Sequence, residues 1–189
     1  YTRMACLARR EKLGRVTGIL LDLGISSAQL DSPDRGFSFR FDAPLDMRFD
    51  KSRNFSASDV VNGFRESDLA DVIYRFGQEK KSKKIASEIV KRRPIHTTGE
   101  LRDIVSRIVG IHSGRIHPAT RVFQAIRIAV NEELSNLVKG LADGLDLLTH
   151  GGRLIVISYH SLEDRLVKNF FRDESRTCIC LPEIPVCRC

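Results

Sequence analysis

Long apolar runs are missing from this chain of 189 residues. No segment approaches the roughly 18–20 apolar residues that a helix needs to span a bilayer, and no charged segment followed by an apolar one stands at the start. These absences argue against a membrane protein and against a secreted one. We therefore expect a soluble, cytoplasmic protein without a membrane partner, and the sequence indicates no oligomeric state.

Cysteine is nearly absent outside the C-terminal segment. Cys6 is the exception, and its place in a short expected helix is typical of a small core residue rather than of a nucleophile. The other four form two Cys-x-Cys pairs, Cys178, Cys180, Cys187 and Cys189. Because disulfides are disfavoured in the cytosol, these thiolates are candidate ligands for zinc or for an iron–sulfur cluster, although zinc sites usually carry Cys-x-x-Cys.

Acidic residues are also fewer than basic residues. The chain carries 31 lysines and arginines against 24 aspartates and glutamates, which gives a formal net charge of +7. This excess points to a polyanionic partner, with nucleic acid as the leading class. With 42% hydrophobic residues the chain can bury a core, and its length favours one domain or one domain with an insertion.

The first part of the chain has α/β character and ends in a candidate functional carboxylate. A helix is expected over Thr2–Leu13, closed by Gly14, and a strand from Val16 to Leu23. The uninterrupted apolar residues of that strand are typical of a parallel sheet buried on both faces. Asp22 lies at its carboxyl end, where open α/β sheets bind ligands; the alternative is an aspartate that caps the next helix.

The middle of the chain is expected to be helical, after a long loop rich in turn residues and arginine. Two capping boxes, Ser56 with Asp59 and Thr97 with Glu100, mark helix starts, and apolar residues recur at helical spacing between them. No strand pattern interrupts this stretch. We therefore predict an inserted all-α domain over residues 41–117.

The last part returns to α/β character. A long helix is expected after His117, a second helical segment from about Leu141 to Leu148, and a strand over Arg153–Tyr159. Ser161 and Asp164 fit a further capping box before a final helix. A strand on each side of a helical insert predicts one sheet that is interrupted by an inserted domain.

Five long motifs occur in a defined order along the chain. They are the segments Gly18–Asp31, Arg35–Phe39, Pro44–Arg48, His117–Asn131 and Ile157–Arg165. Together they closely resemble the MraW/RsmH family, whose members are S-adenosylmethionine-dependent methyltransferases acting on the N4 amine of a cytidine in small-subunit (16S) ribosomal RNA, near the decoding centre. The resemblance covers essentially the whole chain, unlike a match to one short motif.

The resemblance implies a fold and a domain arrangement. The fold is a class I, Rossmann-like methyltransferase sheet with an inserted all-α domain. Residues 1–40 would form the C-terminal part of the first half of the methyltransferase domain, residues 41–117 a substrate-recognition domain, and residues 118–189 the second half with a cysteine-rich tail.

The resemblance also assigns residues to the methyl donor. The family's strand-end aspartate maps onto Asp22, its glutamine after the paired serines onto Gln29, and an aromatic residue beside the adenine onto Tyr1. The family's glycine-rich loop and ribose-binding acid lie upstream and have no counterpart here. Because the chain starts without methionine and stops inside the cysteine cluster, we expect it to be cut from a longer protein, incomplete at the N-terminus of the sheet. Alone, it is expected to bind S-adenosylmethionine weakly or not at all and to be inactive.

The implied chemistry needs few groups. An exocyclic amine must be held in line with the methyl group while a carboxylate or a carbonyl accepts its hydrogens. Asp22 fills that place, and Ser158 and His160 follow the neighbouring strand, so all three are candidate catalytic residues. His160 is alternatively a helix-entry residue without a chemical role. The scarcity of cysteine favours methylation of an amine over that of a ring carbon.

Basic side chains are candidates for holding the phosphates of the small-subunit RNA. They are Arg35, Arg48, Lys80, Lys84, Arg115 and Arg121. The lysines alternatively form an ordinary solvated helix face. Phe37, Phe39 or Phe41 could stack on a base that leaves its helix, or else pack under the loop.

Two other functions fit parts of the sequence. A non-catalytic RNA-binding module would explain the charge and the missing cofactor loop. An amino-methyltransferase of DNA or another nucleic acid would explain the strand-end aspartate, but the DNA enzymes usually show Asp, Asn or Ser followed by Pro-Pro-aromatic. The sequence Leu23-Gly24-Ile25 differs from that pattern.

Overall fold

The computed structural model describes residues 1–110 and 117–176. The chain divides into two compact units, one made of residues 1–24 and 134–189 and the other of residues 25–133. Each unit is described by itself. No helix in the described ranges is both long enough and apolar enough to cross a membrane.

The first unit is built on two parallel strands, β1 (Val16–Asp22) and β2 (Leu148–Ile157). Leu20 pairs with Ile155 and Asp22 with Ile157, so both strands end at the same edge. The α/β fold class with a parallel sheet is confirmed. Strand β2 begins five residues earlier than the pattern predicts, because Leu148 already pairs with Val16 and the strand then makes an irregularity that includes Gly151, with φ of 77°, before Arg153 pairs with Gly18.

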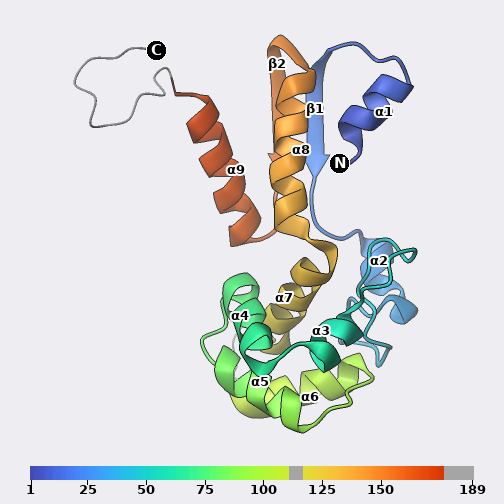
Figure 1. The fold of residues 1–189 in the computed structure, drawn as a ribbon, viewed down its shortest axis with the longest axis vertical. Coiled ribbons are helices and arrows are strands. Elements are labelled where there is room, and N and C mark those ends of the chain that lie inside the picture. Colours follow the sequence, from blue (N-terminus) through green and yellow to red (C-terminus); the bar gives the residue numbers. More distant parts are fainter. Residues whose placement is uncertain (111–116, 177–189) are drawn as a thin grey trace, which may run out of the picture. The chain divides into compact units, whose positions relative to one another are not determined.

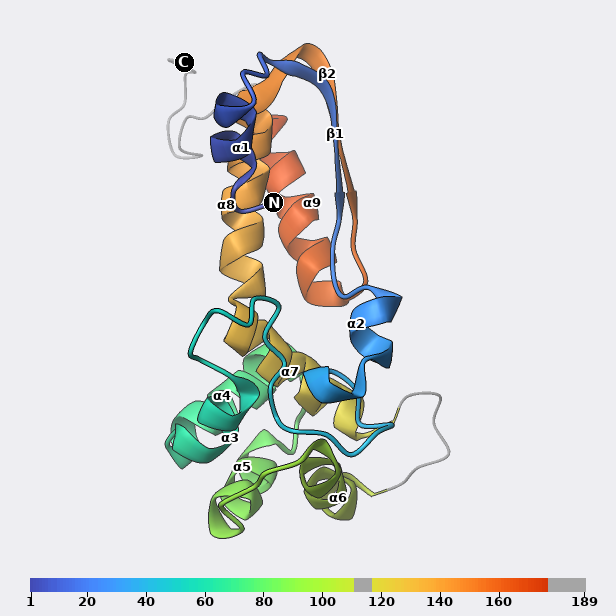
Figure 2. The ribbon, with the colours of Figure 1, turned by 90° about the vertical axis from the view of Figure 1, so that its right-hand side faces the viewer.

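Three helices belong to this unit: α1 (Met4–Arg10), α8 (Glu133–Leu147) and α9 (Ser161–Glu174). Figure 2 shows α8 and α9 on the same side of the two strands. Their apolar side chains enclose a small core with strand β1 and the residue that follows it, made of Leu21, Leu23, Leu137, Leu141 and Val167.

The opposite face of the sheet is exposed in the described part of the chain. Leu20 on β1 is 61% exposed and Ile155 on β2 is 54% exposed. The prediction of a strand buried on both faces is therefore wrong for these residues. Side chains alternate across a strand, and the described helices α8 and α9 cover one face only.

The second unit is helical. Its elements are α2 (Ser27–Asp31), a 3₁₀ turn η1 (Pro33–Arg35), α3 (Ala57–Gly63), α4 (Glu66–Gly77), α5 (Ser82–Lys91), α6 (Thr98–Val109) and α7 (Ala119–Asn131), seen together in Figure 1. The predicted capping boxes of α3 and α6 are confirmed, because Asp59 and Glu100 return to the caps Ser56 and Thr97. Fully buried side chains such as Leu69, Ile85 and Ile126 form its core.

The boundary between α7 and α8 differs from the prediction. The long helix ends at Asn131, because Glu132 adopts a left-handed backbone with φ of 52°, and α8 then continues unbroken to Leu147. Arg127 and Glu133 form a buried two-point ion pair of 2.8 and 3.0 Å across this break. Charge-assisted pairs of this geometry stabilise the local break in the helical backbone at Glu132, where a helical pattern alone predicts continuity.

Candidate functional site

The joint carboxyl end of β1 and β2 gathers polar and aromatic groups in the first unit. Asp22 ends β1, and the backbone N–H of Leu23 continues the ladder by donating to the carbonyl of Ile157 at 3.1 Å. Gly24 then turns with φ of 84°, and the ring of Tyr159 packs against it so closely that an added Cβ would lie 3.1 Å from Cδ2. The turn therefore needs glycine for its backbone angle as well as for the ring beside it.

Tyr159 contacts the strand-end carboxylate directly. Its hydroxyl donates to Oδ1 of Asp22 at 2.9 Å, and its backbone N–H donates to Oε2 of Glu163 at 3.1 Å. The hydrogen bond to Asp22, together with the negative charge of that carboxylate, raises the pKa of the Tyr159 phenol above its ordinary value. The ring is 67% exposed, so it offers an aromatic face to solvent beside Asp22.

A cavity of about 560 Å³ lies between α1 and β1. Tyr1 and Asp22, two of the three predicted cofactor-binding residues, line it together. Most of the remaining wall is apolar, with Met4, Leu7 and Leu20 among the lining residues. Its volume lies within the roughly 300–1,000 Å³ typical of small-molecule sites.

Gln29, the third predicted cofactor-binding residue, belongs to the second unit. Its Oε1 accepts from the backbone N–H of Ser26 at 3.0 Å and from the Ser26 hydroxyl at 3.3 Å, which completes the capping box of α2. The side chain is therefore held at the start of α2. Its amide NH₂ is the part of the side chain that remains suited to donate to a ligand.

Of the other two predicted catalytic residues, Ser158 is half-buried directly after β2, and His160 is the N-cap of α9. Nδ1 of His160 accepts from the backbone N–H of Glu163 at 3.3 Å, and Nε2 lies 3.3 Å from Oε1 of Glu163. The predicted capping box of Ser161 and Asp164 is wrong, because the imidazole caps the helix one residue earlier. The structure thus gives His160 the helix-entry position that the sequence left open.

Two predicted RNA-binding arginines hold the loop before α3 together. Arg48 pairs with both carboxylate oxygens of Asp46 at 2.7 and 3.0 Å. Arg35 donates to the carbonyls of Arg48 and Phe49 at 2.7 and 3.2 Å. The pKa of Asp46 is lowered, first by its hydrogen bond to the Arg48 side chain. These guanidinium groups therefore have local partners that order the loop.

The remaining predicted RNA-binding residues differ in their surroundings. Lys80 and Lys84 are exposed near the start of α5. Arg121 on α7 lies 3.7 Å from the buried carboxylate of Glu79. Arg115 and the four cysteines at 178, 180, 187 and 189 lie outside the described residues.

The three phenylalanines of the loop also separate. Phe37 is buried in the helical core and stacks on Phe49 with 5.5 Å between ring centroids. Phe39 packs edge-on against Phe123. Phe41 is 44% exposed and is the most exposed of the three, since Phe39 is half-buried.

Comparison with known proteins identifies the family. A model of the MraW methylase family matches residues 1–189. This chain belongs to that family. Among curated relatives, "Ribosomal RNA small subunit methyltransferase H" of Dehalococcoides mccartyi (strain 195) is 51% identical over 189 residues, covering 100% of this chain and 54% of the relative. The proteins of that name from Thermomicrobium roseum and Geotalea uraniireducens are 51% and 53% identical, over 100% and 98% of this chain and 59% and 62% of their own lengths.

Membership of the MraW methylase family gives the strand-end cluster a context. The chain spans a little over half the length of the curated relatives it matches. Within this span, the sequence patterns indicated Asp22, Ser158 and His160 but not Tyr159, which makes the direct contact with Asp22. Tyr159 stands two residues after the end of β2, at the sheet edge where β1 ends with Asp22. That position is the signal in the sequence that could have identified it.

Proposed function

We propose that this chain supplies one part of the active site of a methyltransferase. The enzyme would move a methyl group from S-adenosylmethionine to the N4 amine of a cytidine in small-subunit ribosomal RNA, near the decoding centre. The observation that carries the proposal is Asp22, which ends a parallel strand, lines a cavity with Tyr1 and contacts an exposed tyrosine, in a member of the MraW methylase family. Such an enzyme would work in the cytoplasm, where ribosomal subunits are.

The residues present fit part of the methyl donor. The cavity offers an aromatic ring at Tyr1, a largely apolar wall and the carboxylates of Asp22 and Glu11, a combination suited to a nucleoside with cationic groups. We assign Tyr1 and Asp22 to binding it, and the assignment of Gln29 rests on the family resemblance alone. When bound, S-adenosylmethionine supplies an electrophilic methyl group on a sulfonium.

The acceptor amine needs orientation more than activation by a strong base. Its lone pair is conjugated with the ring, so a group that accepts a hydrogen bond from the N–H localises that pair toward the methyl group. The Asp22 carboxylate and the backbone carbonyls near it can accept such a bond. Tyr159 limits the carboxylate's freedom by occupying Oδ1, and its exposed ring can cover one face of the pyrimidine.

We assign RNA recognition to the helical insert predicted over residues 41–117. This part of the chain includes α3 to α6 and the exposed lysines of α5. A non-catalytic RNA-binding role would use the same lysines but would not require Asp22. The role of Asp22 therefore separates the two functions.

A chimeric enzyme tests the proposal. Residues 1–189 replace the matching segment of the Dehalococcoides mccartyi relative, and methyl transfer is measured on small ribosomal subunits from cells that lack the enzyme. We expect transfer to one cytidine N4, with Asp22→Asn lowering the rate about 10²–10⁴-fold, the range for loss of a positioned acceptor. Asp146→Asn, an exposed carboxylate on α8, is the matched control and should leave the rate unchanged.

Three results would count against the proposal or a part of it. An active chimera that tolerates Asp22→Asn would remove the strand-end carboxylate from the mechanism. A chimera that binds subunits but transfers no methyl group would favour the RNA-binding role. Transfer to a different atom would keep the methyltransferase and discard the N4 specificity.

A further inference from the structure

A second cavity, of about 550 Å³, opens on the surface of the helical unit beside α4 and the start of α5. It is lined by Tyr74 from α4 and by Lys80, Lys81, Lys83 and Lys84 around the start of α5. Its volume again falls in the roughly 300–1,000 Å³ range of small-ligand sites. An aromatic side chain and several cations therefore share one hollow.

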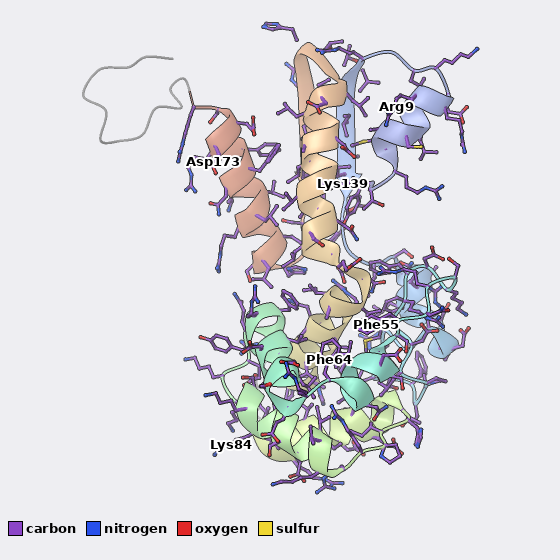
Figure 3. The ribbon with its side chains drawn as sticks, viewed as in Figure 1. Arg9, Phe55, Phe64, Lys84, Lys139 and Asp173 are labelled. Atoms are coloured by element: carbon purple, nitrogen blue, oxygen red, sulfur yellow. The ribbon has the colours of Figure 1, made fainter. Side chains whose placement is uncertain are left out.

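The lysines of this hollow have different partners. The Lys81 ammonium donates to the carbonyls of Ile108 and Val109 at 3.0 and 3.2 Å, so it caps the C-terminal end of α6. Lys80, Lys83 and Lys84 are exposed and form no ion pair within the described part of the chain. Figure 3 shows Lys84 on the outer side of α5, away from the other helices. Among the described residues, three ammonium groups thus have no carboxylate partner.

The local charge is positive on balance. Asp71 is the one carboxylate among the lining residues, against four lysines. The first turn of α5 carries no acidic residue. The buried carboxylate of Glu79, however, accepts from the backbone N–H of Lys81 at 2.9 Å and offsets the helix dipole at the start of α5, so the attraction for an anion rests on the lysines.

Tyr74 is not needed by the core. The buried side of α4 consists of Leu69, Ala70, Ile73 and Gly77, whereas Tyr74 is 59% exposed. By contrast, Phe55 and Phe64, labelled in Figure 3, pack against each other with 6.0 Å between ring centroids. An exposed ring beside unpaired lysines is the combination that proteins use to bind single-stranded nucleic acid, where bases stack and phosphates meet cations.

We propose that this hollow is a subsite for one nucleotide of single-stranded RNA, with the base stacked on Tyr74 and the phosphates bound by Lys80, Lys83 and Lys84. The inference rests on the proposed function, because it names a contact surface for the RNA partner. It differs from the strand-end site, since it lies wholly on the second unit and includes no residue assigned to methyl transfer.

Binding of RNA to residues 1–189 tests the subsite. The probe is a fluorescein-labelled single-stranded RNA about 12 nucleotides long, followed by fluorescence anisotropy. We expect Tyr74→Ala to weaken binding about tenfold, in line with the loss of one stacked base, and Tyr74→Phe to bind within about twofold of the parent.

The charge contribution is read from salt dependence. Replacing Lys83 and Lys84 together by glutamine should flatten the slope of log Kd against log salt by about 1.4, or about 0.7 for each lost phosphate contact. Lys91→Gln is the matched control, because Lys91 is exposed on the same helix and does not line the hollow. Circular dichroism of each variant confirms that the helices are retained.

Several outcomes would overturn the subsite. RNA binding that is absent, or that is unchanged in Tyr74→Ala and in the double lysine variant, removes it. If Tyr74→Ala weakens the binding of a duplex RNA of the same length as much as that of the single strand, the subsite is also ruled out, because paired bases cannot stack on the ring. If inorganic polyphosphate displaces the RNA and Tyr74→Ala does not change RNA binding, the lysines form only a general anion-binding surface.

The chimeric enzyme separates this inference from the proposed function. Tyr74→Ala should raise KM for small subunits while leaving kcat unchanged, since Tyr74 touches no reacting atom. If the chimera transfers no methyl group while RNA binding still depends on Tyr74, the proposed function fails and the subsite stands. If methyl transfer is intact and Tyr74→Ala changes neither KM nor RNA binding, the subsite fails alone.

Discussion

Among single residues, the Tyr159 phenol reports most directly on the strand-end site. Its pKa is raised because the Asp22 carboxylate accepts its proton in a hydrogen bond and repels the phenolate. The protonated phenol is therefore the form favoured by the fold. The stabilisation of the folded chain by this hydrogen bond is fully present below pH 10.0, the ordinary pKa of a tyrosine phenol. It is lost as the pH rises through the raised pKa of Tyr159.

We expect Asp22→Asn to return the pKa of Tyr159 toward its ordinary value, because the neutral amide no longer repels the phenolate. The chain has three tyrosines, so a background with Tyr1→Phe and Tyr74→Phe leaves Tyr159 as the only phenol. Phenolate absorbance during an alkaline titration then measures it alone. Ionisation at the ordinary value in the parent, with no response to Asp22→Asn, would show that the hydrogen bond does not persist in solution.

Single residues also mark the limit of sequence reasoning at this site. The position of Asp22 followed from an apolar run that ends in a carboxylate, which is a local signal. The contact between Asp22 and Tyr159 joins residues far apart in the chain and depends on the parallel register of β1 and β2. Likewise, Ser161 is a usual N-cap residue, yet the backbone path after β2 places the imidazole of His160 at the cap.

Among the helices and strands, close contact between α4 and α7 shapes the helical unit. An added Cβ at Gly77 would lie 2.5 Å from the carbonyl oxygen of Arg121 and 3.2 Å from Cβ of Ala125. The two helices approach each other at this glycine. Sequence periodicity predicted both helices, but it cannot show which glycine lies at their crossing.

We expect Gly77→Ala to lower the free energy of unfolding by about 1–3 kcal/mol, because the backbone of α7 must move away from the new methyl group. Gly63→Ala is the control, since nothing lies within 4 Å of an added Cβ at the end of α3. That change should be neutral or should stabilise by up to about 1 kcal/mol through helix propensity. Urea unfolding followed by circular dichroism measures both. Equal effects at the two sites would contradict the close helix approach.

Across the whole molecule, the two units differ in how much apolar surface they bury. The second unit has a core drawn from α3 to α7, with many fully buried side chains. In the described part of the first unit, the core cluster between the sheet and the helices holds five buried apolar residues, and Leu20 and Ile155 are exposed on the other face. Composition predicted that a core could form, but not this unequal division, because an uninterrupted apolar strand does not show which of its two faces the described helices cover.

This difference predicts unequal protection from hydrogen exchange. Local opening costs more free energy where more apolar contacts must break, so the amides of α4, α5 and α7 should exchange most slowly. Those of β1, β2 and α9 should exchange faster, since their common core is small. Exchange of residues 1–189 followed by mass spectrometry and corrected for intrinsic rates measures this order. Slowest exchange in β1 and β2 would mean that the stability of the chain resides in its sheet, and that burial in the described helical core is a poor guide to where unfolding begins.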